Sequence, residues 1–565
     1  MSQPVSPADR AVIAQALGAA AREMGAKLVR SAYSTVVREA RDASAAIVDA
    51  RGNTITQAEL IPIQLGSIGE TLAPCLARFP AATLAPGDIL VNNDPYHGGQ
   101  HLQDVFIFTP IFVAGRVVAF AASVAHHLDL GGGAAGLNNA ATDLYQEGLV
   151  IPPSRFNLAR DWNGGPFERF LAANVRVPAQ TIGDVNAQLA ANHIGAARVM
   201  ELCRRHGPAL VEAVMDSLLD YAEARVRAAI AALPDGRYQG EDWLDDDGEG
   251  PDPVPIRVTV TKAGDTLDVD YAGTAPQVAR NINAPFASTV SATLSCLKLV
   301  LTGPDVPFNE GAKRPITIRA PLGSLLNPRH PAPVRARMEP CYRAFGALMR
   351  AFAVAAPARV MAAGYDTTTA IVLSRLGPDG YRVYIDIHGG GWGARADGDG
   401  EDAIAGPLGN CANTPAEVID AEYGFFRLAR YGLRPDSAGA GRHRGGVGLV
   451  REFEVLEPGV RFALYADRFR LAPRGLFGGH DGRPAACWIE RGGQTIRCGA
   501  KATVALEPGD RLVLETAGGA GYGDPDARPA AFARRDVDEG FVAAPEGVIA
   551  VPEGVIAARA GTRDG

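Results

Sequence analysis

The sequence predicts an α+β protein of several lobes, with a mixed N-terminal region, a helical hairpin and a β-rich C-terminal half. Apolar residues recur at helical spacing over residues 7–34 and 184–233, whereas apolar and polar residues alternate with period two over 256–271. Short apolar runs separated by glycine turns fill much of 449–516. A chain of 565 residues exceeds what one hydrophobic core serves, so three or four domains are expected.

The N-terminal elements follow from caps, turns and periodicity. Ser6 and Pro7 supply an N-cap and a first-turn proline for the opening helix. The turn-rich residues 50–53 separate two short apolar segments, which predicts a β-hairpin. Four further elements are predicted here: a helix over 67–79, a strand over 88–91, and two apolar strands joined at Gly115 and ending at residue 127.

The central elements begin with a helical hairpin over 184–233, broken near Gly207 and Pro208. The acidic stretch 234–253 follows, and its aspartates, Asp245 among them, lack the spacing of a calcium-binding EF-hand loop. A solvated turn is therefore predicted there. Beyond it we expect an antiparallel hairpin around 262–265, helices over 288–302 and 339–355, and strands over 449–465 and 487–516.

Changes of pattern place lobe boundaries near residues 250 and 415. A seven-residue motif that starts at Pro545 and again at Pro552 is too short to define a repeat protein. The predicted units are a mixed α and β region with the candidate site and the helical hairpin (1–250), a central α+β region (251–415), a β-rich region (416–540) and a loose tail (541–565).

Composition argues against several classes of protein. The net charge of −8 argues against a nucleic-acid partner. The seven cysteines are odd in number, scattered and never spaced as CxxC, which predicts a reduced, cytoplasmic protein without a disulfide framework. The N-terminus lacks a basic leading segment, and the most apolar stretch, 105–125, is interrupted by Pro110 and Arg116. Neither a secretory signal nor a membrane span is predicted.

Histidines and aspartates gather in one part of the chain, which is the strongest chemical signal in the residues themselves. Imidazole and carboxylate together suit a divalent transition metal, and an open coordination position can lower the pKa of a bound water to ~7. The alternative is that these side chains cap loops or satisfy buried backbone groups. The cluster consists of His97, His101, His126, His127, Asp94, Asp104 and Asp129.

The spacing within this cluster allows a shared ion. His101 and Asp104 would face it from a loop and from the first residue of a strand, and a tight turn at Gly115 would return the next strand beside Asp104. Because successive strand residues face opposite sides, only one of His126 and His127 can easily join them.

Other common chemistries lack their motifs. No GxxxxGK[ST] phosphate loop occurs, and the glycine clusters 389–393 and 518–523 lack the strand-to-helix setting of a dinucleotide site. Ser67 has leucine where a nucleophile elbow needs its first glycine, and Cys203 lies on an arginine-rich helical segment where packing is the better interpretation.

Longer motifs resemble the hydantoinase B/oxoprolinase family over nearly the whole chain. The N-terminal ones are Arg41-Asp42, Asn93-Asp-Pro-Tyr-His-Gly-Gly-Gln-His-Leu-Gln-Asp104, Ala125-His-His-Leu-Asp-Leu-Gly131 and Leu144-Tyr-Gln-Glu-Gly-Leu-Val-Ile-Pro-Pro153. The later ones are Asn281-Ile-Asn-Ala-Pro, Gly303-Pro-Asp-Val-Pro-Phe-Asn309, Asn413-Thr-Pro-Ala-Glu417, Leu433-Arg-Pro-Asp-Ser-Ala-Gly-Ala-Gly441 and Gly518-Gly-Ala-Gly-Tyr-Gly-Asp-Pro525. The chain looks like a stand-alone B subunit, since it lacks the kinase-like A half that some members carry.

The resemblance implies an ATP-dependent reaction on a small cyclic amide, shared between two subunits. A separate hydantoinase A-type, kinase-like subunit would phosphorylate the amide oxygen. Metal-bound water in the B subunit would then attack the activated carbon and open the ring. ATP would be used by the partner and not bound by this chain, and a heteromer such as A₂B₂ is expected.

The resemblance also implies site residues. One divalent metal, zinc, manganese or iron, would be held by Asp42, His101, Asp104 and His126, with His127 beside them orienting ligands or the reacting water.

Four other residues are weaker candidates. Asp94 and Glu147 are candidates for moving protons, with capping of the turn at 95–96 and anchoring of the following loop as alternatives. Tyr96 and His97 are candidates for lining the substrate pocket, with surface packing as the alternative.

Two other functions stay open. The family also resembles components of ATP-dependent ketone carboxylases, such as acetone carboxylase, and a non-catalytic scaffold for the A-type partner is the third possibility. The intact histidine and aspartate cluster argues against the scaffold. Among hydrolytic substrates, 5-oxoproline, hydantoins and larger lactams all fit the motifs.

Overall fold

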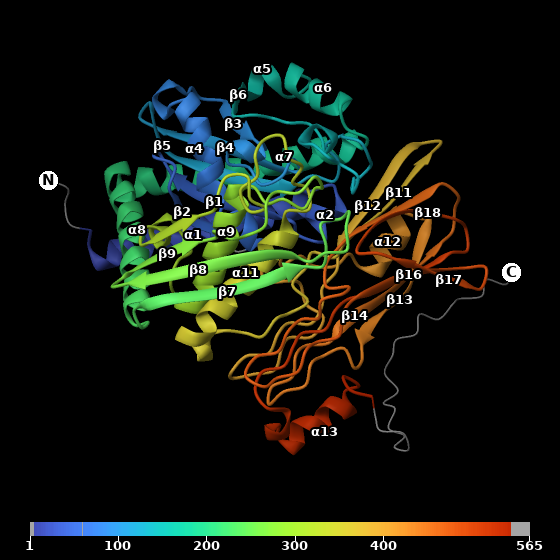
Figure 1. The fold of residues 1–565 in the computed structure, drawn as a ribbon. Helices are drawn as coiled ribbons and strands as arrows, with labels where there is room; N and C mark the ends of the chain where they lie inside the picture. Colours follow the sequence, from blue (N-terminus) through green and yellow to red (C-terminus); the bar gives the residue numbers. More distant parts are fainter. Residues whose placement is uncertain (1–4, 59, 544–565) are drawn as a thin grey trace.

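The computed structural model describes residues 5–58 and 60–543 and shows a mixed α and β protein with four β-sheets in this part of the chain (Figure 1). The predicted α+β class is confirmed, and most of the chain between Ala370 and Glu515 is strand and turn. The helices are α1 (Pro7–Ser31), α2 (Thr35–Arg38), α3 (Pro62–Leu65), α4 (Ile68–Arg78), α5 (Leu158–Asp161), α6 (Pro166–Ala173), α7 (Pro178–His206), α8 (Pro208–Ala231), α9 (Phe286–Leu301), α10 (Glu310–Lys313), α11 (Met338–Ala355), α12 (Ala416–Glu422) and α13 (Ala530–Asp538).

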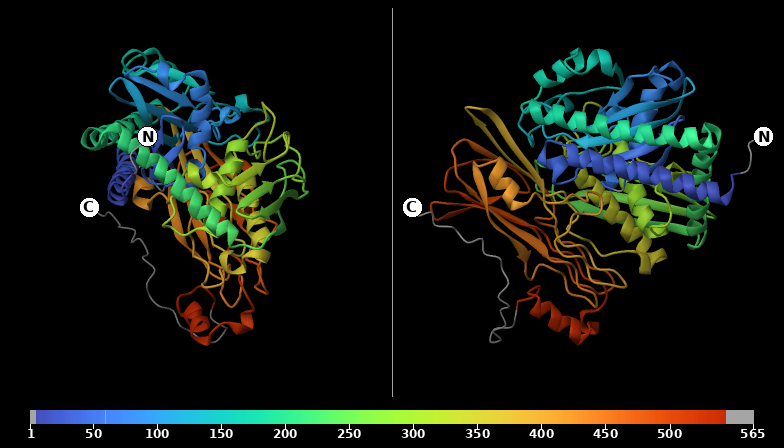
Figure 2. Two further views of the ribbon diagram at one scale, coloured as in Figure 1. Left: turned by 90° about the vertical axis from the view of Figure 1, so that its left-hand side faces the viewer. Right: turned by 180° about the vertical axis from the view of Figure 1, so that it is seen from behind.

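The first sheet lies between helical layers. Alternate residues of β1 enter different cores: Ala45 and Ile47 pack in the cluster that contains α1, whereas Ala46 and Val48 pack with α4. Helices α1 and α7 lie side by side on one face (Figure 2). The strand order is β2 (Thr54–Ala58), β1 (Ala43–Asp49), β5 (Arg116–His126), β4 (Asp104–Val113), β3 (Asp88–Asn92), β6 (Ser154–Asn157).

The local predictions for this region are confirmed. The hydroxyl of Ser6 accepts a hydrogen bond from the backbone N–H of Asp9 and caps α1. Strands β1 and β2 form the predicted hairpin, and β4 and β5 pair across the turn at Gly115, which has φ +80°. The helical hairpin breaks at Gly207, as expected, but its first helix begins earlier than predicted, because Pro178 opens the first turn.

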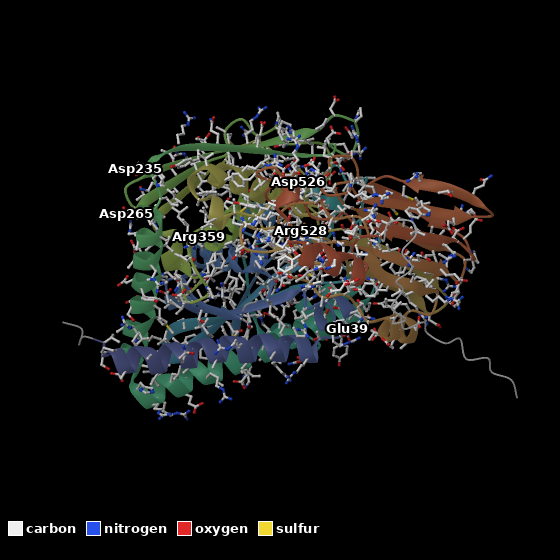
Figure 3. The ribbon with its side chains drawn as sticks, turned by 90° about the horizontal axis from the view of Figure 1, so that it is seen from below. Glu39, Asp235, Asp265, Arg359, Asp526 and Arg528 are labelled. Atoms are coloured by element: carbon white, nitrogen blue, oxygen red, sulfur yellow. The ribbon has the colours of Figure 1, made fainter. Side chains whose placement is uncertain are left out.

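The second sheet carries α11 on one face and corrects one prediction. Part of the acidic stretch 234–253 is strand β7, and Asp245 is buried rather than solvated. The Asp245 carboxylate accepts hydrogen bonds from the backbone N–H groups of Phe469, Arg470 and Leu471 at 2.6–3.1 Å. Figure 3 shows Asp235 and Asp265 at the same end of this sheet. The strand order is β10 (Ile316–Arg319), β9 (Thr266–Asp270), β8 (Val254–Ala263), β7 (Gly236–Leu244).

The last two sheets pack face to face around one apolar core. Side chains such as Leu373 and Phe462 from one sheet meet Phe453 and Leu514 from the other. One sheet has the order β12 (Gly380–Ile387), β11 (Ala370–Gly377), β15 (Val460–Tyr465), β18 (Lys501–Leu506). The other has the order β13 (Phe426–Arg434), β14 (Gly448–Val455), β19 (Arg511–Glu515), β16 (Ala486–Arg491), β17 (Gln494–Cys498).

The lobe boundaries near 250 and 415 stay predictions. The first falls in the loop between β7 and β8, which pair in one sheet, and the second falls just before α12. Of the predicted loose tail, residues 544–565 lie outside the described residues, as does the motif duplicated at Pro545 and Pro552. No helix among the described residues is long and apolar enough to cross a membrane.

Candidate metal centre

Three of the four predicted metal ligands meet at one end of the first sheet. Asp104 is the first residue of β4 and His126 is the last of β5, and the two face each other in the antiparallel register. Asp42 directly precedes β1, and its carbonyl oxygen accepts a hydrogen bond from the backbone N–H of His126 at 3.0 Å. The order β1–β5–β4 therefore puts Asp42, His126 and Asp104 in one row.

The fourth side chain, His101, reaches the same point from the loop before β4. Its Nδ1 lies 3.2 Å from Asp104 Oδ2, while His126 Nδ1 lies 3.7 Å from both Asp104 Oδ1 and Asp42 Oδ2. Potential ligand atoms of His101, Asp104 and His126 all lie within 4.8 Å of one another. Four ligands of a tetrahedral ion at ~2.0–2.1 Å are about 3.3 Å apart, so this set of buried donors fits one divalent transition metal.

Burial and neighbouring charges set the protonation of these groups. Burial, with help from nearby Arg337, holds the pKa of His101 well below its ordinary value, so its ring is neutral and able to ligate. Burial also raises the pKa of Asp42 to about 6. Burial acts to raise the pKa of Asp104 as well, but the charge of Arg337 and hydrogen bonding with His101 and His126 outweigh burial and hold the pKa of Asp104 well below its ordinary value.

Neutral and cationic donors hold the two carboxylates in place. Gln64 Nε2 donates to Asp42 Oδ1 at 2.8 Å and to Asp104 Oδ1 at 3.3 Å. Arg337 Nη2 donates to Asp104 Oδ2 at 2.6 Å and to Gln100 Oε1 at 2.9 Å. Groups that bind metal ligands in this way fix the direction of the ligand lone pairs.

Three of the four side chains, Asp42, His101 and His126, line a small cavity, and Asp104 lies directly behind His101 and His126. The volume of the cavity is about 40 Å³, which admits an ion and a water or two, whereas sites for small organic ligands occupy ~300–1,000 Å³. Distant parts of the chain complete the wall. These residues are Met338 and Tyr342 of α11 and, from the C-terminal half, Thr368, Ile387, Gly409, Cys411 and Tyr465.

His127 points to the other side of the sheet. Its Nε2 lies 3.0 Å from Gln188 Oε1 on α7, its Nδ1 has no hydrogen-bond partner among the described residues, and burial lowers its pKa. The expectation that only one of the two histidines joins the cluster agrees with this geometry.

Asp94, Tyr96 and His97 also lie outside the cavity lining. Asp94 caps a short 3₁₀ turn by accepting from the backbone N–H of Tyr96 at 2.9 Å, and its second oxygen lies 2.7 Å from His97 Nδ1. The His97 side chain is exposed. The Tyr96 hydroxyl donates to the carbonyl oxygen of Ala332 at 2.6 Å, and its ring meets the edge of His330.

Glu147 is buried and binds the same segment as Tyr96. Its carboxylate accepts hydrogen bonds from the backbone N–H groups of Val334 and Arg335 at 2.9–3.0 Å. Burial raises the pKa of Glu147 to about 8, against the effect of these hydrogen bonds. Tyr96 and Glu147 thus hold the segment 329–337, which carries Arg337 to Asp104.

Sequence reasoning missed Gln64, Arg337 and Cys411. The glutamine and the arginine carry no spacing signal, because each reaches the cluster through a fold contact between segments far apart in the chain. Cys411 lines the cavity with a thiol whose pKa is raised well above its ordinary value by burial and by nearby carboxylates.

Comparisons with known proteins agree with one another. The model of the hydantoinase B/oxoprolinase family matches residues 6–525. The putative B subunit of a D-/L-hydantoinase from Pseudomonas sp. (strain NS671) is 34% identical over 561 residues, covering 95% of this chain and 93% of that protein. The beta subunit of the caprolactamase from Pseudomonas jessenii is 32% identical over 569 residues, covering 95% and 94%.

Two solved structures share the fold. The crystal structure of ATP-dependent caprolactamase from Pseudomonas jessenii has a TM-score of 0.88 at 30% sequence identity, covering 96% of this chain and 95% of that chain. A nucleotide-free acetone carboxylase structure has a TM-score of 0.84 and covers 95% of this chain and 78% of that chain. Its sequence identity is 17%, so this likeness is one of fold alone.

Proposed function

This chain belongs to the hydantoinase B/oxoprolinase family, and on that premise we propose that it is the metal-binding subunit of an ATP-dependent enzyme that opens cyclic amides. The observation that carries the proposal is the convergence of the buried side chains Asp42, His101, Asp104 and His126 at one end of the first sheet, where all but Asp104 line one small cavity. The names of the relatives, one a hydantoinase component and the other a caprolactamase component, support cyclic amides as the substrate class.

In this proposal the four side chains hold one divalent ion, zinc, manganese or iron. Such an ion lowers the pKa of bound water and so supplies a nucleophile near neutral pH. Gln64 and Arg337 fix the directions of the ligating carboxylates, while the apolar and aromatic wall of the cavity excludes bulk water.

In this proposal the partner subunit activates the substrate. A separate A-type, kinase-like subunit, in a heteromer such as A₂B₂, would use ATP to phosphorylate the amide oxygen and make the carbon electrophilic. One water would then add to that carbon and the ring C–N bond would break, with a proton passing to the nitrogen, which leaves an acyl phosphate. A second water would hydrolyse this acyl phosphate to the carboxylate and inorganic phosphate. A cytoplasmic location fits a protein that depends on ATP.

We assign positioning roles to the remaining predicted residues. Tyr96 and Glu147 hold the segment that carries Arg337, Asp94 and His97 stabilise the turn beside Tyr96, and His127 joins the end of β5 to α7. In this structure each of these side chains contacts backbone or neighbouring groups and none of them lines the cavity. Proton transfer by Asp94 or Glu147 would require the site to open.

Metal content tests the proposal directly. Elemental analysis of unchelated protein should find about one transition-metal ion per chain in the native protein and in His193→Ala, an exposed histidine on α7. The ion should be lost in His101→Ala and in Asp104→Ala, with circular dichroism showing that both variants are folded. With the A-type partner and ATP, only the native protein and His193→Ala should open a lactam or hydantoin ring.

Two results would overturn the proposal. If the native protein contains no metal, or if both site variants retain it, the ligand assignment is wrong and a scaffold role gains support. If the loaded complex carboxylates a ketone and leaves cyclic amides intact, the reaction class is wrong although the metal site is right.

A further inference from the structure

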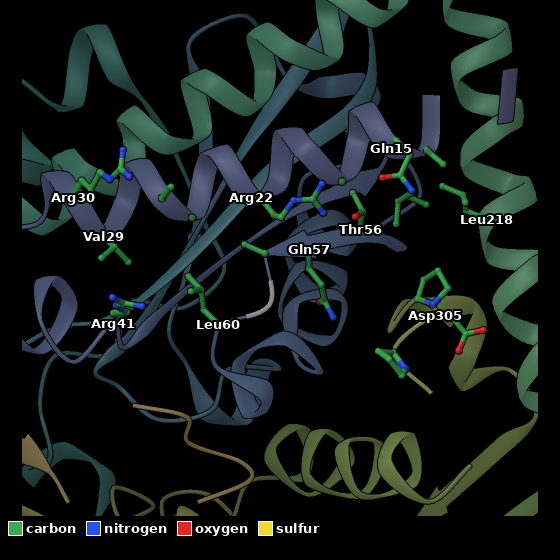
Figure 4. A pocket seen from close by; sticks show the side chains of 18 of the residues that line it. Gln15, Arg22, Val29, Arg30, Arg41, Thr56, Gln57, Leu60, Leu218 and Asp305 are labelled. Carbon is green, nitrogen blue, oxygen red and sulfur yellow. The ribbon is translucent and has the colours of Figure 1, made fainter. Parts of the chain in front are cut away.

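A second, much larger cavity lies on the outside of the N-terminal half. It is an open groove of about 980 Å³ between α1, β2, α8 and the segment 304–307 (Figure 4). None of the nine predicted site residues lines it. Small residues on the facing elements leave the space, including Gly18, Gly25 and Ala58.

Three arginines of this groove have no protein partner in the described part of the chain. Arg22, Arg30 and Arg41 are exposed, line the groove, and make no hydrogen bond or ion pair through their guanidinium groups with any described residue. Other exposed arginines differ in this respect: Arg198 pairs with Glu23 at 2.8 Å, whereas Arg10 and Arg204 have no ion pair with a described residue.

Among the residues that the structure describes, the other charged side chains of the groove lining are Arg38 and Asp305, and both are paired. Arg38 binds Glu39 at 2.8 Å and also Glu422, and the Asp305 carboxylate accepts from Arg225 at 2.8 Å. The described lining therefore has an excess of positive charge, on a chain whose net charge is −8.

The arginines follow the length of the groove. Arg22 and Arg30 are eight residues apart on α1, which places them about 80° apart around the helix axis and about 12 Å apart along it. Figure 4 shows Arg30 and Arg41 at one end with Val29 and Leu60, Arg22 near the middle, and Leu218 and Asp305 at the other end.

The cationic end of the groove backs onto the candidate metal centre. Arg41 and Leu60 line the groove, whereas their chain neighbours Asp42 and Ile61 line the metal cavity. Arg41 adopts φ +60°, a left-handed conformation that is uncommon for residues other than glycine. Strained backbone of this kind concentrates at functional positions, and here it lies where adjacent residues supply the two cavities.

We propose that this groove binds a phosphorylated organic molecule of nucleotide size, with its phosphate groups held by Arg22, Arg30 and Arg41. Guanidinium groups form paired, charge-assisted hydrogen bonds with phosphate oxygens, and the volume lies in the range of small-molecule sites. Val29, Leu60 and Leu218 supply apolar contacts along the same walls. This site is separate from the metal cavity and from the ATP used by the partner, so it goes beyond the proposed function.

Calorimetric titration of the isolated full chain with three probes tests the proposal. ADP carries a ring and phosphates, pyrophosphate carries phosphates alone, and adenosine carries the ring alone. We expect ADP and pyrophosphate to bind and adenosine to bind far more weakly. Loss of one charged hydrogen-bonding group should weaken ADP binding about tenfold or more, so Arg22→Gln and the double variant Arg30→Gln/Arg41→Gln should each lose affinity.

Arg10→Gln is the matched control, because Arg10 is an exposed arginine of the same helix that lies outside the groove lining. It should bind ADP like the native chain, and all variants should keep the native melting temperature since the substituted side chains are exposed. Metal content measured on the same samples is independent of this result, so failure of the groove is distinguishable from failure of the proposed function.

Three outcomes would overturn the proposal. The first is no binding of ADP or pyrophosphate at low ionic strength. The second is ADP binding that the groove variants and Arg10→Gln leave equally unchanged. The third is binding of a polyglutamate peptide, but of neither phosphate probe, which would assign the groove to an acidic protein segment.

Discussion

At the scale of single residues, a substitution of Gln64 tests how the neighbours of the proposed ligands affect metal affinity. The Gln64 amide donates to carboxylates on two different segments, Asp42 and Asp104, and it is neutral, so replacing it leaves the charge of the site unchanged. Gln64→Leu should weaken metal binding by about 10–100-fold, because both carboxylates lose the donor that aims them. Competition with a fluorescent chelator measures the change.

The control for this prediction is Gln239→Leu, an exposed position on β7. It should bind metal like the native chain. Equal affinity of Gln64→Leu and the native chain would show that the ligands are held in place by the strands alone.

The raised pKa of Glu147 predicts how the stability of the protein changes with pH. Burial raises this pKa from 4.5 to about 8, so between these values the folded chain keeps a proton that the unfolded chain releases. The free energy of unfolding contributed by Glu147 is therefore fully present below pH 4.5 and is lost as the pH rises toward 8. Glu147→Gln should remove this contribution, so its melting temperature should fall less between pH 5 and pH 8 than that of the native protein.

Scanning calorimetry at the two pH values, with the exposed Glu417→Gln as control, checks this difference. Parallel shifts in the native protein and in Glu147→Gln would contradict a protonated Glu147 at neutral pH.

Residue types in the sequence predicted part of the candidate site. A dense cluster of histidine and aspartate is rare enough to indicate metal chemistry, and His101, Asp104 and His126 do converge. Arg337 was not predictable in this way. Arg337 and Asp104 are 233 positions apart in the chain. The sequence alone does not distinguish an arginine that will be buried beside a carboxylate from one that will be exposed.

At the scale of elements, local pairing was predictable and distant pairing was not. Strands β4 and β5 meet through a turn at Ala114 and Gly115, both with positive φ, so glycine and strand alternation suffice to predict their register. Asp42 reaches the site because β1 pairs with β5, a contact between separate segments of the chain. Family resemblance, rather than periodicity, placed Asp42 among the ligands.

Asp245 lies in a stretch whose acidic composition predicted a solvated turn, but its side chain is buried. Three backbone N–H groups of residues 469–471 donate to this one buried carboxylate, which ties the end of β7 to the C-terminal half. Asp245→Ala would leave those donors unpaired and should lower the free energy of unfolding by about 3–5 kcal/mol. Urea denaturation measures it, with the exposed Asp252→Ala as control, expected within about 0.5 kcal/mol of the native value.

A loss for Asp245→Ala no larger than that for Asp252→Ala would restore the solvated-turn interpretation.

At the scale of the whole molecule, the candidate metal centre lies where the region of the first sheet meets α11 and the C-terminal half. The first sheet and the segments that lead into its strands supply the proposed ligands, whereas Tyr342, Cys411 and Tyr465 come from α11 and the C-terminal half and form the opposite wall of the cavity. No local pattern in the sequence predicts this wall, because it depends on how whole regions pack. A cavity of about 40 Å³ also implies that a cyclic amide enters only after these regions separate.

Alkylation of cysteines can report that separation. Cys411 lines the cavity and Cys75 lies in a different core, and both are buried, whereas Cys498 is half-exposed. In the isolated chain iodoacetamide should therefore modify Cys498 at least ~10 times faster than Cys411, since a buried thiol with a raised pKa is both hidden and protonated. Peptide mass spectrometry follows each site.

Adding the partner, ATP and a cyclic amide should accelerate modification of Cys411 while Cys75 stays protected, because only the cavity opens. Equal acceleration at Cys75 would indicate general unfolding rather than opening.

If Cys411 reacts as fast as Cys498 in the isolated chain, the cavity is open without the partner. If it stays protected while the ring is being hydrolysed, the substrate does not enter past Cys411. The small volume of the cavity between the first sheet and the C-terminal half therefore predicts that its widening is coupled to the partner, and the buried Cys411 is the side chain placed to report it.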